Sequence, residues 1–327
     1  MRVILWLVSA MVLLWCGYWY ISAGTLRSGV ETALAVMKAE GRADYSAIEL
    51  DGFPARFRLT VADAVLRNPE GAWIWHAANV VVHALAYSPG QVIAVLPDDQ
   101  TLALEDQTVA LQTTDMRASV AFGLTSTLPL EHAEALSGGI AARSDLGWSL
   151  TATELRLAIR SEDPATFRYR LGAESSGLTL EGFPAEMLAR AKIANGPGHL
   201  RLDLDATFDR PLDRSAGETP PRPTAAAIHA LEFDWGAFSL SGQGDLTITP
   251  DGTPDGTLSL SLANWRGLPP LLVASGAITV DMEQPLTRVM KQLATLSGQP
   301  DQLSLPLTFK AGWVALGPIP LGPAPKF

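Results

Sequence analysis

Strict alternation of apolar and polar residues is the pattern that most restricts how this 327-residue chain can fold. From Leu200 to Phe208, leucine, alanine and phenylalanine alternate with arginine, aspartate and threonine. The same pattern recurs in residues 56–61, 154–159, 167–171, 231–235, 246–248, 258–262 and 303–309. Because successive side chains of a strand point to opposite faces, each segment predicts a strand with one apolar and one polar face. Such strands are typical of antiparallel sheets.

Turn-forming residues separate the alternating segments, and helical patterns are few. Asn68-Pro69, Ser88-Pro89-Gly90 and Asp251-Gly252 interrupt the alternation with residues that favour turns. Helices are predicted over residues 184–193 and over residues 286–296, where apolar side chains recur at helical spacing. The sequence therefore predicts a mainly β fold of meandering antiparallel sheets with a few helices.

A charge-free apolar run at the N-terminus predicts one transmembrane helix ahead of the β-rich part. The run Val3–Ile21 is about 19 residues long, which at roughly 1.5 Å per residue covers the hydrocarbon core of a bilayer. A cleaved signal peptide is the alternative, but its apolar core is shorter, and Ile21 stands where a cleavage site needs a small residue. Positive charge stays on the cytoplasmic side of a membrane, so Arg2 predicts a single-pass protein whose body is exported.

The remaining chain divides by pattern into four further parts. We expect residues 1–23 to be the transmembrane anchor and residues 24–42 to be a juxtamembrane helix, which continues the anchor or follows it separately. Residues 43–210 and 224–327 form two β-rich domains or halves. The proline-rich segment 211–223 between them has no period and predicts a linker or mobile loop.

One short motif occurs twice, at residues 50–55 and 180–185, and each copy ends an alternating segment. A glycine permits positive φ and a proline restricts its own φ and that of the preceding residue, so each copy predicts a strand-ending corner with a buried phenylalanine. The corner residues are Gly52, Phe53, Pro54, Gly182, Phe183 and Pro184. The repeat is either a trace of two related halves or a turn that recurs independently.

Charge and cysteine content exclude several classes of function. The net charge of −10 disfavours binding to nucleic acid, because phosphates would be repelled. Cys16 is the single cysteine and lies in the predicted anchor, so the body has no disulfide and no thiol metal site. Glycine-rich phosphate loops, nucleophile elbows and zinc-binding histidine motifs are missing from the sequence. We therefore expect a protein that is not an enzyme, with no catalytic residues, no cofactor and no metal.

Two polar patterns were weighed as sites. Asp203, Asp205 and Asp209 share one face of a predicted strand and offer oxygen ligands for Ca²⁺, but a solvated outer face is the more ordinary interpretation. Arg56 and Arg58, and likewise Arg168 and Arg170, form two cationic rows that suit phospholipid headgroups or an acidic partner, whereas a solvated or cross-strand-paired face is the simpler expectation.

Apolar side chains on the same strands give the remaining candidate site. Trp73 and Trp75 share one face of a predicted strand, and Leu204 points to the apolar face of another. These residues either line an apolar ligand groove or fill a sheet core. We name them as candidate ligand contacts, because tethering at a membrane would place such a groove beside lipid.

Residues Leu50–Phe57 and Trp73–Tyr87, followed by Pro89, resemble a family of bacterial envelope proteins catalogued as domain of unknown function 2125. The resemblance covers nearly the whole body, and Gly52–Phe57 is its most recognisable part. Residues 255–260 and 312–317 are also weakly similar to AsmA-type envelope proteins. The resemblance implies an inner-membrane anchor, a β-rich periplasmic body and a role near lipid handling or envelope upkeep, and it supplies no catalytic residues.

Two functions remain open. The first is a membrane-anchored periplasmic protein that handles lipid or another apolar ligand, with the bilayer as partner through Val3–Ile21. The second is a non-catalytic assembly or scaffold protein of the envelope, whose protein partners the sequence does not identify. They differ in whether the apolar faces of the strands stay open or pack against one another.

Overall fold

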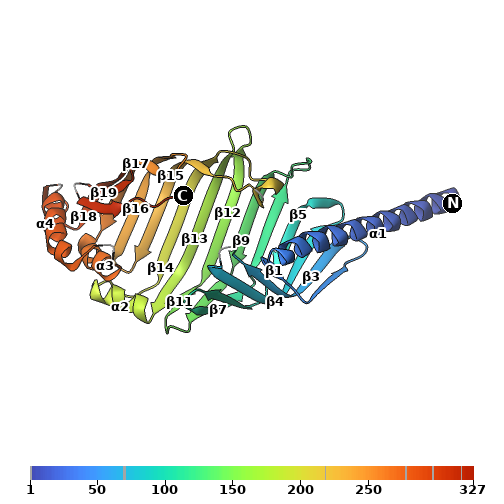
Figure 1. The fold of residues 1–327 in the computed structure, drawn as a ribbon, viewed down its shortest axis with the longest axis horizontal. Helices are drawn as coiled ribbons and strands as arrows, with labels where there is room; N and C mark the ends of the chain where they lie inside the picture. Colours follow the sequence, from blue (N-terminus) through green and yellow to red (C-terminus); the bar gives the residue numbers. More distant parts are fainter. Residues whose placement is uncertain (1, 69–70, 218, 277, 297, 318) are drawn as a thin grey trace. The chain divides into compact units, whose positions relative to one another are not determined.

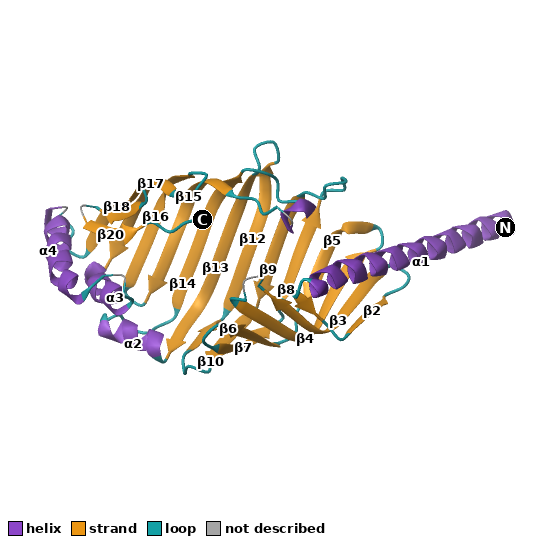
Figure 2. Ribbon diagram, in the orientation of Figure 1, coloured by secondary structure: helices purple, strands orange, loops and turns teal. Residues whose placement is uncertain are grey.

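The computed structural model describes the backbone of residues 2–68, 71–217, 219–276, 278–296, 298–317 and 319–327, and their side chains except those of residues 2–10, 89 and 217. Contacts divide the chain into unit 1 (Met1–Ala121 with Ser144–Leu146) and unit 2 (Phe122–Arg143 with Gly147–Phe327). The strand pairings within both units are antiparallel, so the mainly β, antiparallel prediction is confirmed (Figures 1 and 2).

Unit 1 consists of one long helix and eight strands. The helix, α1, runs from Arg2 to Ala39 without a break. The strands are β1 (Ala43–Asp44), β2 (Ala47–Asp51), β3 (Arg56–Arg67), β4 (Trp73–Leu85), β5 (Ser88–Val95), β6 (Asp99–Leu104), β7 (Thr108–Thr114) and β8 (Arg117–Phe122).

Helix α1 joins the predicted anchor and the predicted juxtamembrane helix into one element. Among the helices whose side chains are described, none has an apolar stretch long enough to cross a membrane. The predicted span Val3–Ile21 falls partly on residues 3–10, whose side chains lie outside the described part of the chain. The structure therefore shows an N-terminal helix at the position of the predicted anchor.

Strand β4 divides its pairing between two sets of strands in unit 1. Its C-terminal part pairs with β5, which continues to β8, whereas its N-terminal part pairs with β6, which continues to β7. Asp63 in β3 has φ of 49°, and the pairing of β3 with β4 keeps the same register on both sides of it. One long strand therefore serves both sets.

Unit 2 contains most of the regular sheet. Its strands are β9 (Leu130–Ser137), β10 (Gly139–Ser144), β11 (Ser149–Ala152), β12 (Glu154–Asp163), β13 (Arg168–Glu181), β14 (Gly198–Phe208), β15 (Pro223–Trp235), β16 (Phe238–Ile248), β17 (Pro254–Ala263), β18 (Gln302–Lys310), β19 (Trp313–Leu316) and β20 (Ile319–Pro323). Its helices are α2 (Phe183–Arg190), the 3₁₀ turns η1 (Arg214–Gly217) and η2 (Trp265–Gly267), α3 (Leu268–Ala274) and α4 (Val280–Leu296).

The strands of unit 2 follow a simple meander. From β12 to β20 each strand pairs with the next one in the chain, and β9 adds to the other side of β12. The long strands β12 to β16 lie side by side in Figure 1. This arrangement places all the apolar positions of consecutive strands on one face.

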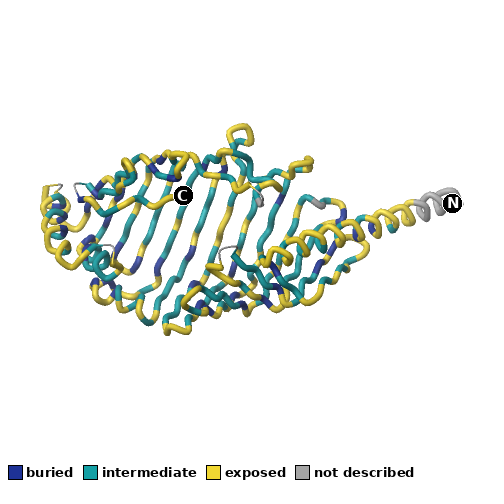
Figure 3. The backbone as a smooth tube through the Cα atoms, viewed as in Figure 1, coloured by how far each residue is buried: buried dark blue, intermediate teal, exposed yellow. Residues whose placement is uncertain are grey.

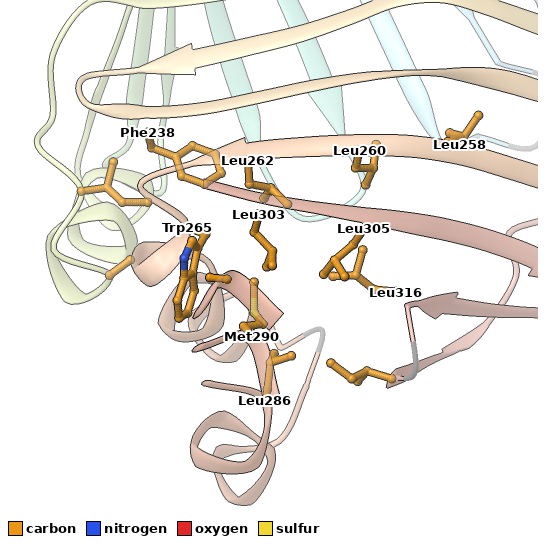
Figure 4. Close-up of a cluster of buried hydrophobic side chains, with 14 of the residues drawn as sticks. Phe238, Leu258, Leu260, Leu262, Trp265, Leu286, Met290, Leu303, Leu305 and Leu316 are labelled. Atoms are coloured by element: carbon orange, nitrogen blue, oxygen red, sulfur yellow. The ribbon is translucent and has the colours of Figure 1, made fainter. Parts of the chain in front are cut away.

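A closed hydrophobic core forms at one end of this sheet, where α2, α3 and α4 lie (Figure 2). Met290 of α4 is fully buried, and Trp265 of η2 is 1% exposed. Their neighbours include buried leucines of β17 and β18 such as Leu262 and Leu303 (Figure 4). The apolar side chains that recur at helical spacing in α4 therefore pack against the apolar face of the alternating strands.

The segment 211–223 connects two neighbouring strands inside unit 2. β14 and β15, on either side of it, pair along almost their whole lengths. Within the segment, Leu212 accepts a backbone hydrogen bond from Leu130 and donates one to the Tyr169 hydroxyl. In this structure the segment is thus a connection that folds back onto its own sheet, and the division into units falls elsewhere.

Candidate apolar binding face

Rows of apolar residues run across the strands of unit 2 on a single face. The strand register places one residue of each strand directly opposite its neighbour. One row, from β12 to β18, is Leu157, Ala173, Leu202, Leu231, Gly242, Leu260 and Leu305. The adjacent row is Ile159, Leu171, Leu204, Ile228, Gly244, Leu258 and Leu307.

Burial decreases along the first of these rows from the closed core outwards. Leu260 and Leu305 are buried in the closed core, Leu202 and Leu231 are only half-buried, and Leu157 is 43% exposed. Figure 3 shows the long strands mostly in the colours of intermediate and exposed residues. We call the half-buried and exposed part the open apolar face, which consists of Leu157, Ile159, Leu171, Leu202, Leu204 and Leu231.

The open apolar face is bounded within unit 2. On one side lies the closed core, whose partly buried margin reaches Ile228 and Leu240. At one end of the strands, Tyr169 packs edge-on against Phe208 with ring centroids 5.8 Å apart, and the Tyr169 hydroxyl accepts the amide of Leu212. These two boundaries leave the apolar residues of β12 to β15 between them.

The opposite face of the same strands is charged and internally paired. Arg170 binds Asp203 through two hydrogen bonds of 2.9 and 2.7 Å, and this guanidinium holds the pKa of the Asp203 carboxyl below its usual value. Arg201 lies 3.9 Å from Glu232 on the next strand. The cross-strand pairing expected of arginines in these rows is therefore confirmed for Arg170.

The three aspartates weighed as a calcium site have separate partners. Asp203 binds Arg170, Asp205 lies 3.2 Å from His229, and Asp209 accepts the backbone amide of Arg222. Within the described residues, no group of three or more acidic, histidine or cysteine side chains is placed to hold a metal.

The three predicted ligand contacts belong to different units. Leu204 lies on the open apolar face of unit 2, as its alternation predicts. Trp73 and Trp75 belong to unit 1, where Trp73 is exposed and the Trp75 indole donates to Gln100 Oε1 at 2.9 Å. Gln100 is itself buried, and its amide also donates to the Pro97 carbonyl, so Trp75 serves a polar network in the fold.

Both Gly-Phe-Pro motifs form corners, but their phenylalanines are not buried. Gly52 has φ of 107° and Gly182 has φ of 71°, values that favour glycine. Phe53 is 47% exposed and Phe183 is exposed as well. The expectation of a buried phenylalanine was wrong, because Phe53 lies in the turn against Trp19 and Tyr20 of α1 and keeps about half of its surface exposed. The buried ring is Phe57, two residues after the first motif.

The first corner is clamped to α1 by hydrogen bonds that the sequence does not reveal. Three side-chain donors of α1 reach backbone carbonyls of unit 1, one in the β2–β3 turn, one in the β4–β5 turn and one at the first residue of β3. The pairs are Trp15 Nε1 to Pro54 O at 3.0 Å, Tyr18 Oη to Ala86 O at 2.9 Å, and Trp19 Nε1 to Arg56 O at 3.2 Å. Aromatic residues at the end of a predicted anchor were the available signal, but their partners lie more than thirty-five positions away.

Ring packing reinforces this clamp. Trp19 is buried and stacks on Phe57 with ring centroids 5.5 Å apart, and it meets Phe53 edge-on at 5.3 Å. Trp19, Ala23, Phe57 and Ala86 form a second hydrophobic cluster. The corner therefore holds the helix against the strands of unit 1.

A comparison with known families shows to which family the chain belongs. The family model described as "Uncharacterized protein conserved in bacteria (DUF2125)" matches residues 19–325. The chain belongs to this family. No curated protein and no solved structure matches it, and the weak similarity to AsmA-type proteins is not shown by any comparison.

The match places the DUF2125 region on the structure. It begins at Trp19, the residue of α1 that packs on the first corner, and it includes every residue of the open apolar face. The family description states no activity, so any function has to be argued from the geometry of these features.

Proposed function

We propose that this DUF2125 protein binds an apolar ligand of the lipid class on the open apolar face of unit 2, while α1 tethers it to a bilayer. The single observation that carries the proposal is the loss of burial along one continuous row, from buried Leu260 to Leu157 at 43% exposure. The same sheet thus has a closed part and an open part of identical chemistry.

Contiguous apolar surface on a folded protein calls for an explanation. Isolated exposed leucines are ordinary, whereas a contiguous apolar patch bounded by polar residues marks a binding surface. Here Leu157, Leu202 and Leu231 are directly opposite one another or separated by Ala173 alone, so the patch is continuous across four strands. Adjacent strands lie about 4.8 Å apart, which gives the patch a width of roughly 14 Å.

A hydrocarbon chain is the occupant that suits this surface. The side chains of the open apolar face present only alkyl groups, so they offer no specific hydrogen bond to a polar ligand. Burial of each methylene group contributes about 0.8 kcal/mol, so a ligand with about ten buried methylenes gains roughly 8 kcal/mol before the cost of association. For the same reason we propose binding rather than catalysis.

The membrane tether rests on the N-terminal helix. Met11, Leu13 and Leu14 expose most of their side chains and lie within the charge-free run Val3–Ile21. Burial of these side chains in hydrocarbon is favourable, and Arg2 favours a cytoplasmic N-terminus. We therefore propose a single-pass protein of the bacterial inner membrane with the strands of both units in the periplasm.

Lipid extraction from purified protein tests the proposal. Full-length protein is purified in mild detergent and its bound lipid is measured by native mass spectrometry. We expect co-purifying lipid with wild type and its loss with Leu157→Asp and with Leu204→Asp, because a carboxylate on the face is disfavoured beside hydrocarbon. Leu157 lies outside the closed core and is 43% exposed, so its substitution should leave the closed core intact.

The matched control is Ala158→Asp. Ala158 is the next residue of β12, points to the charged face and lies between Arg156 and Arg160. This variant adds the same charge to the same strand and should keep its lipid. Lipid that persists in Leu157→Asp and Leu204→Asp belongs to α1 instead, and folded wild type without any lipid would favour the scaffold function.

A further inference from the structure

We propose that the two turns clamped to α1 dock on the headgroup layer of a phospholipid bilayer, so that unit 1 is seated on the membrane and does not hang from it. The turns are residues 52–55 and 86–87. The contact surface, here called the aromatic collar, consists of Trp15, Tyr18, Tyr20, Phe53 and Tyr87. This inference rests on the membrane tether of the proposed function and is independent of ligand binding in unit 2.

The clamp fixes the position of both turns along the helix. The indole of Trp15 and the hydroxyl of Tyr18 hold one turn each, through Pro54 O and Ala86 O. The turns are also joined to each other, because the Ala86 amide donates to Ala55 O at 3.1 Å. Phe53 and Tyr87 are consequently held beside the C-terminal part of the charge-free run Val3–Ile21 of α1.

Hydrogen bonding at the clamp suits a site of low polarity. A backbone carbonyl near hydrocarbon is costly unless it has a donor, since little water reaches it. The carbonyls of Pro54, Ala86 and Arg56 each accept a side-chain donor from α1. Turns that face only water would need no such donors.

Exposed rings complete the collar. Tyr20 is 67% exposed and Tyr87 is 69% exposed, although each carries a large apolar ring. Phe53 stacks on Tyr20 with ring centroids 5.9 Å apart and still leaves 47% of its surface open. Aromatic side chains of this kind prefer the boundary between hydrocarbon and headgroups.

An apolar groove connects the collar to the exposed part of the helix. It has a volume of about 680 Å³ and lies between α1 and the first corner, with Met11, Leu14, Trp15, Phe53 and Pro54 among its lining residues. The groove opens beside the apolar run of α1, so an acyl chain of the lipid around the helix also fills the groove. Bilayer lipid is therefore the partner that covers the whole surface at once.

Site-specific fluorescence tests this docking. Cys16→Ser removes the single cysteine, and Phe53→Cys or Tyr87→Cys then accepts a nitrobenzoxadiazole label in the full chain. The labelled proteins are reconstituted in vesicles of equimolar phosphatidylethanolamine and phosphatidylglycerol. We expect both labels to emit at a shorter wavelength than free dye does in detergent-free buffer. We also expect lipids that carry a doxyl group near the headgroup to quench both labels.

Leu146→Cys is the matched control. Leu146 is an exposed leucine of unit 1, and the neighbouring Asp145 amide bonds to Thr108 O near the Trp73 end of β4. β4 has 13 residues, so at roughly 3.3 Å per residue this end lies about 40 Å from the collar. The label there should remain in water and resist quenching.

Three outcomes would overturn the docking. In the first, the labels at positions 53 and 87 behave as the label at Leu146 does while the protein floats with the vesicles, which leaves the tether intact and removes the collar. In the second, all three labels are quenched alike, which indicates general adsorption. In the third, the protein fails to float with the vesicles, which rejects both the tether and the collar. The lipid measurement on unit 2 is independent of this result.

Discussion

The first corner offers a quantitative test of the clamp through the substitution Gly52→Ala. An added Cβ at this position would lie 2.7 Å from the Arg56 carbonyl oxygen, a distance that real Cβ atoms do not tolerate. The φ of 107° is strained for any residue with a side chain. The same carbonyl accepts the indole of Trp19, so relief of the clash disturbs the attachment of α1.

The expected loss of stability can be assembled from these contributions. Backbone strain costs about 1–3 kcal/mol, and a weakened hydrogen bond to Trp19 costs about 1 kcal/mol more. We expect Gly52→Ala to lower the free energy of unfolding by roughly 2–4 kcal/mol in urea titrations of the full chain in detergent, followed by near-ultraviolet circular dichroism.

Gly41→Ala is the control for backbone strain alone. Gly41 also has a positive φ, of 72°, but an added Cβ there meets nothing within 4 Å. Its substitution should cost about 1 kcal/mol. Equal losses for the two variants would refute the reasoning, because they would show that the contact with Arg56 and the link to Trp19 contribute nothing.

Three further predictions follow from buried or paired groups. Gln100→Leu should lower the free energy of unfolding by about 2–3 kcal/mol, because it leaves the Trp75 indole and other buried polar atoms without their partner; a urea midpoint equal to wild type would contradict this. Met290→Ala should cost about 2–5 kcal/mol in the closed core, whereas Trp313→Ala, at an exposed position, should change stability by less than about 0.5 kcal/mol; similar losses for both would contradict the assignment of the core. Two threonine hydroxyls lower the pKa of Asp251 to about 2, so its stabilising contribution is complete above its ordinary pKa of 3.8 and is lost as pH falls towards 2; carboxyl chemical shifts that titrate near 3.8 would show that the hydrogen bonds are missing.

The alternation of side chains predicted on which face of the sheet each residue lies, but not whether another layer covers that face. In β14 the pattern correctly placed Leu202 and Leu204 on one face and Arg201 on the other, because a strand has a period of two whatever surrounds it. The helical face with Leu286 and Met290 was likewise visible, and both residues are buried. Whether another layer covers a given leucine depends on contacts far along the chain, so the sequence left an open face and a closed core as alternatives.

Long-range polar contacts were the other feature that sequence could not supply. No sequence pattern distinguishes Gln100 from other polar residues, yet its side chain is buried and accepts a hydrogen bond from Trp75, twenty-five positions earlier. The clamp on α1 depends on Trp15 and Trp19, whose acceptors are backbone atoms that carry no side-chain signature. Backbone acceptors occur at every residue, so only the three-dimensional arrangement selects among them.

Photochemical cross-linking tests the central claim, the open apolar face as a lipid site, most directly. Full-length protein in its native membrane is exposed to a phospholipid that carries a diazirine at the end of one acyl chain, irradiated and digested, and the modified peptides are sequenced. We expect adducts on peptides that contain Leu157, Leu171, Leu202 or Leu231, in addition to those on α1. Adducts confined to α1 and the aromatic collar would contradict it, because the open apolar face would then hold no lipid chain.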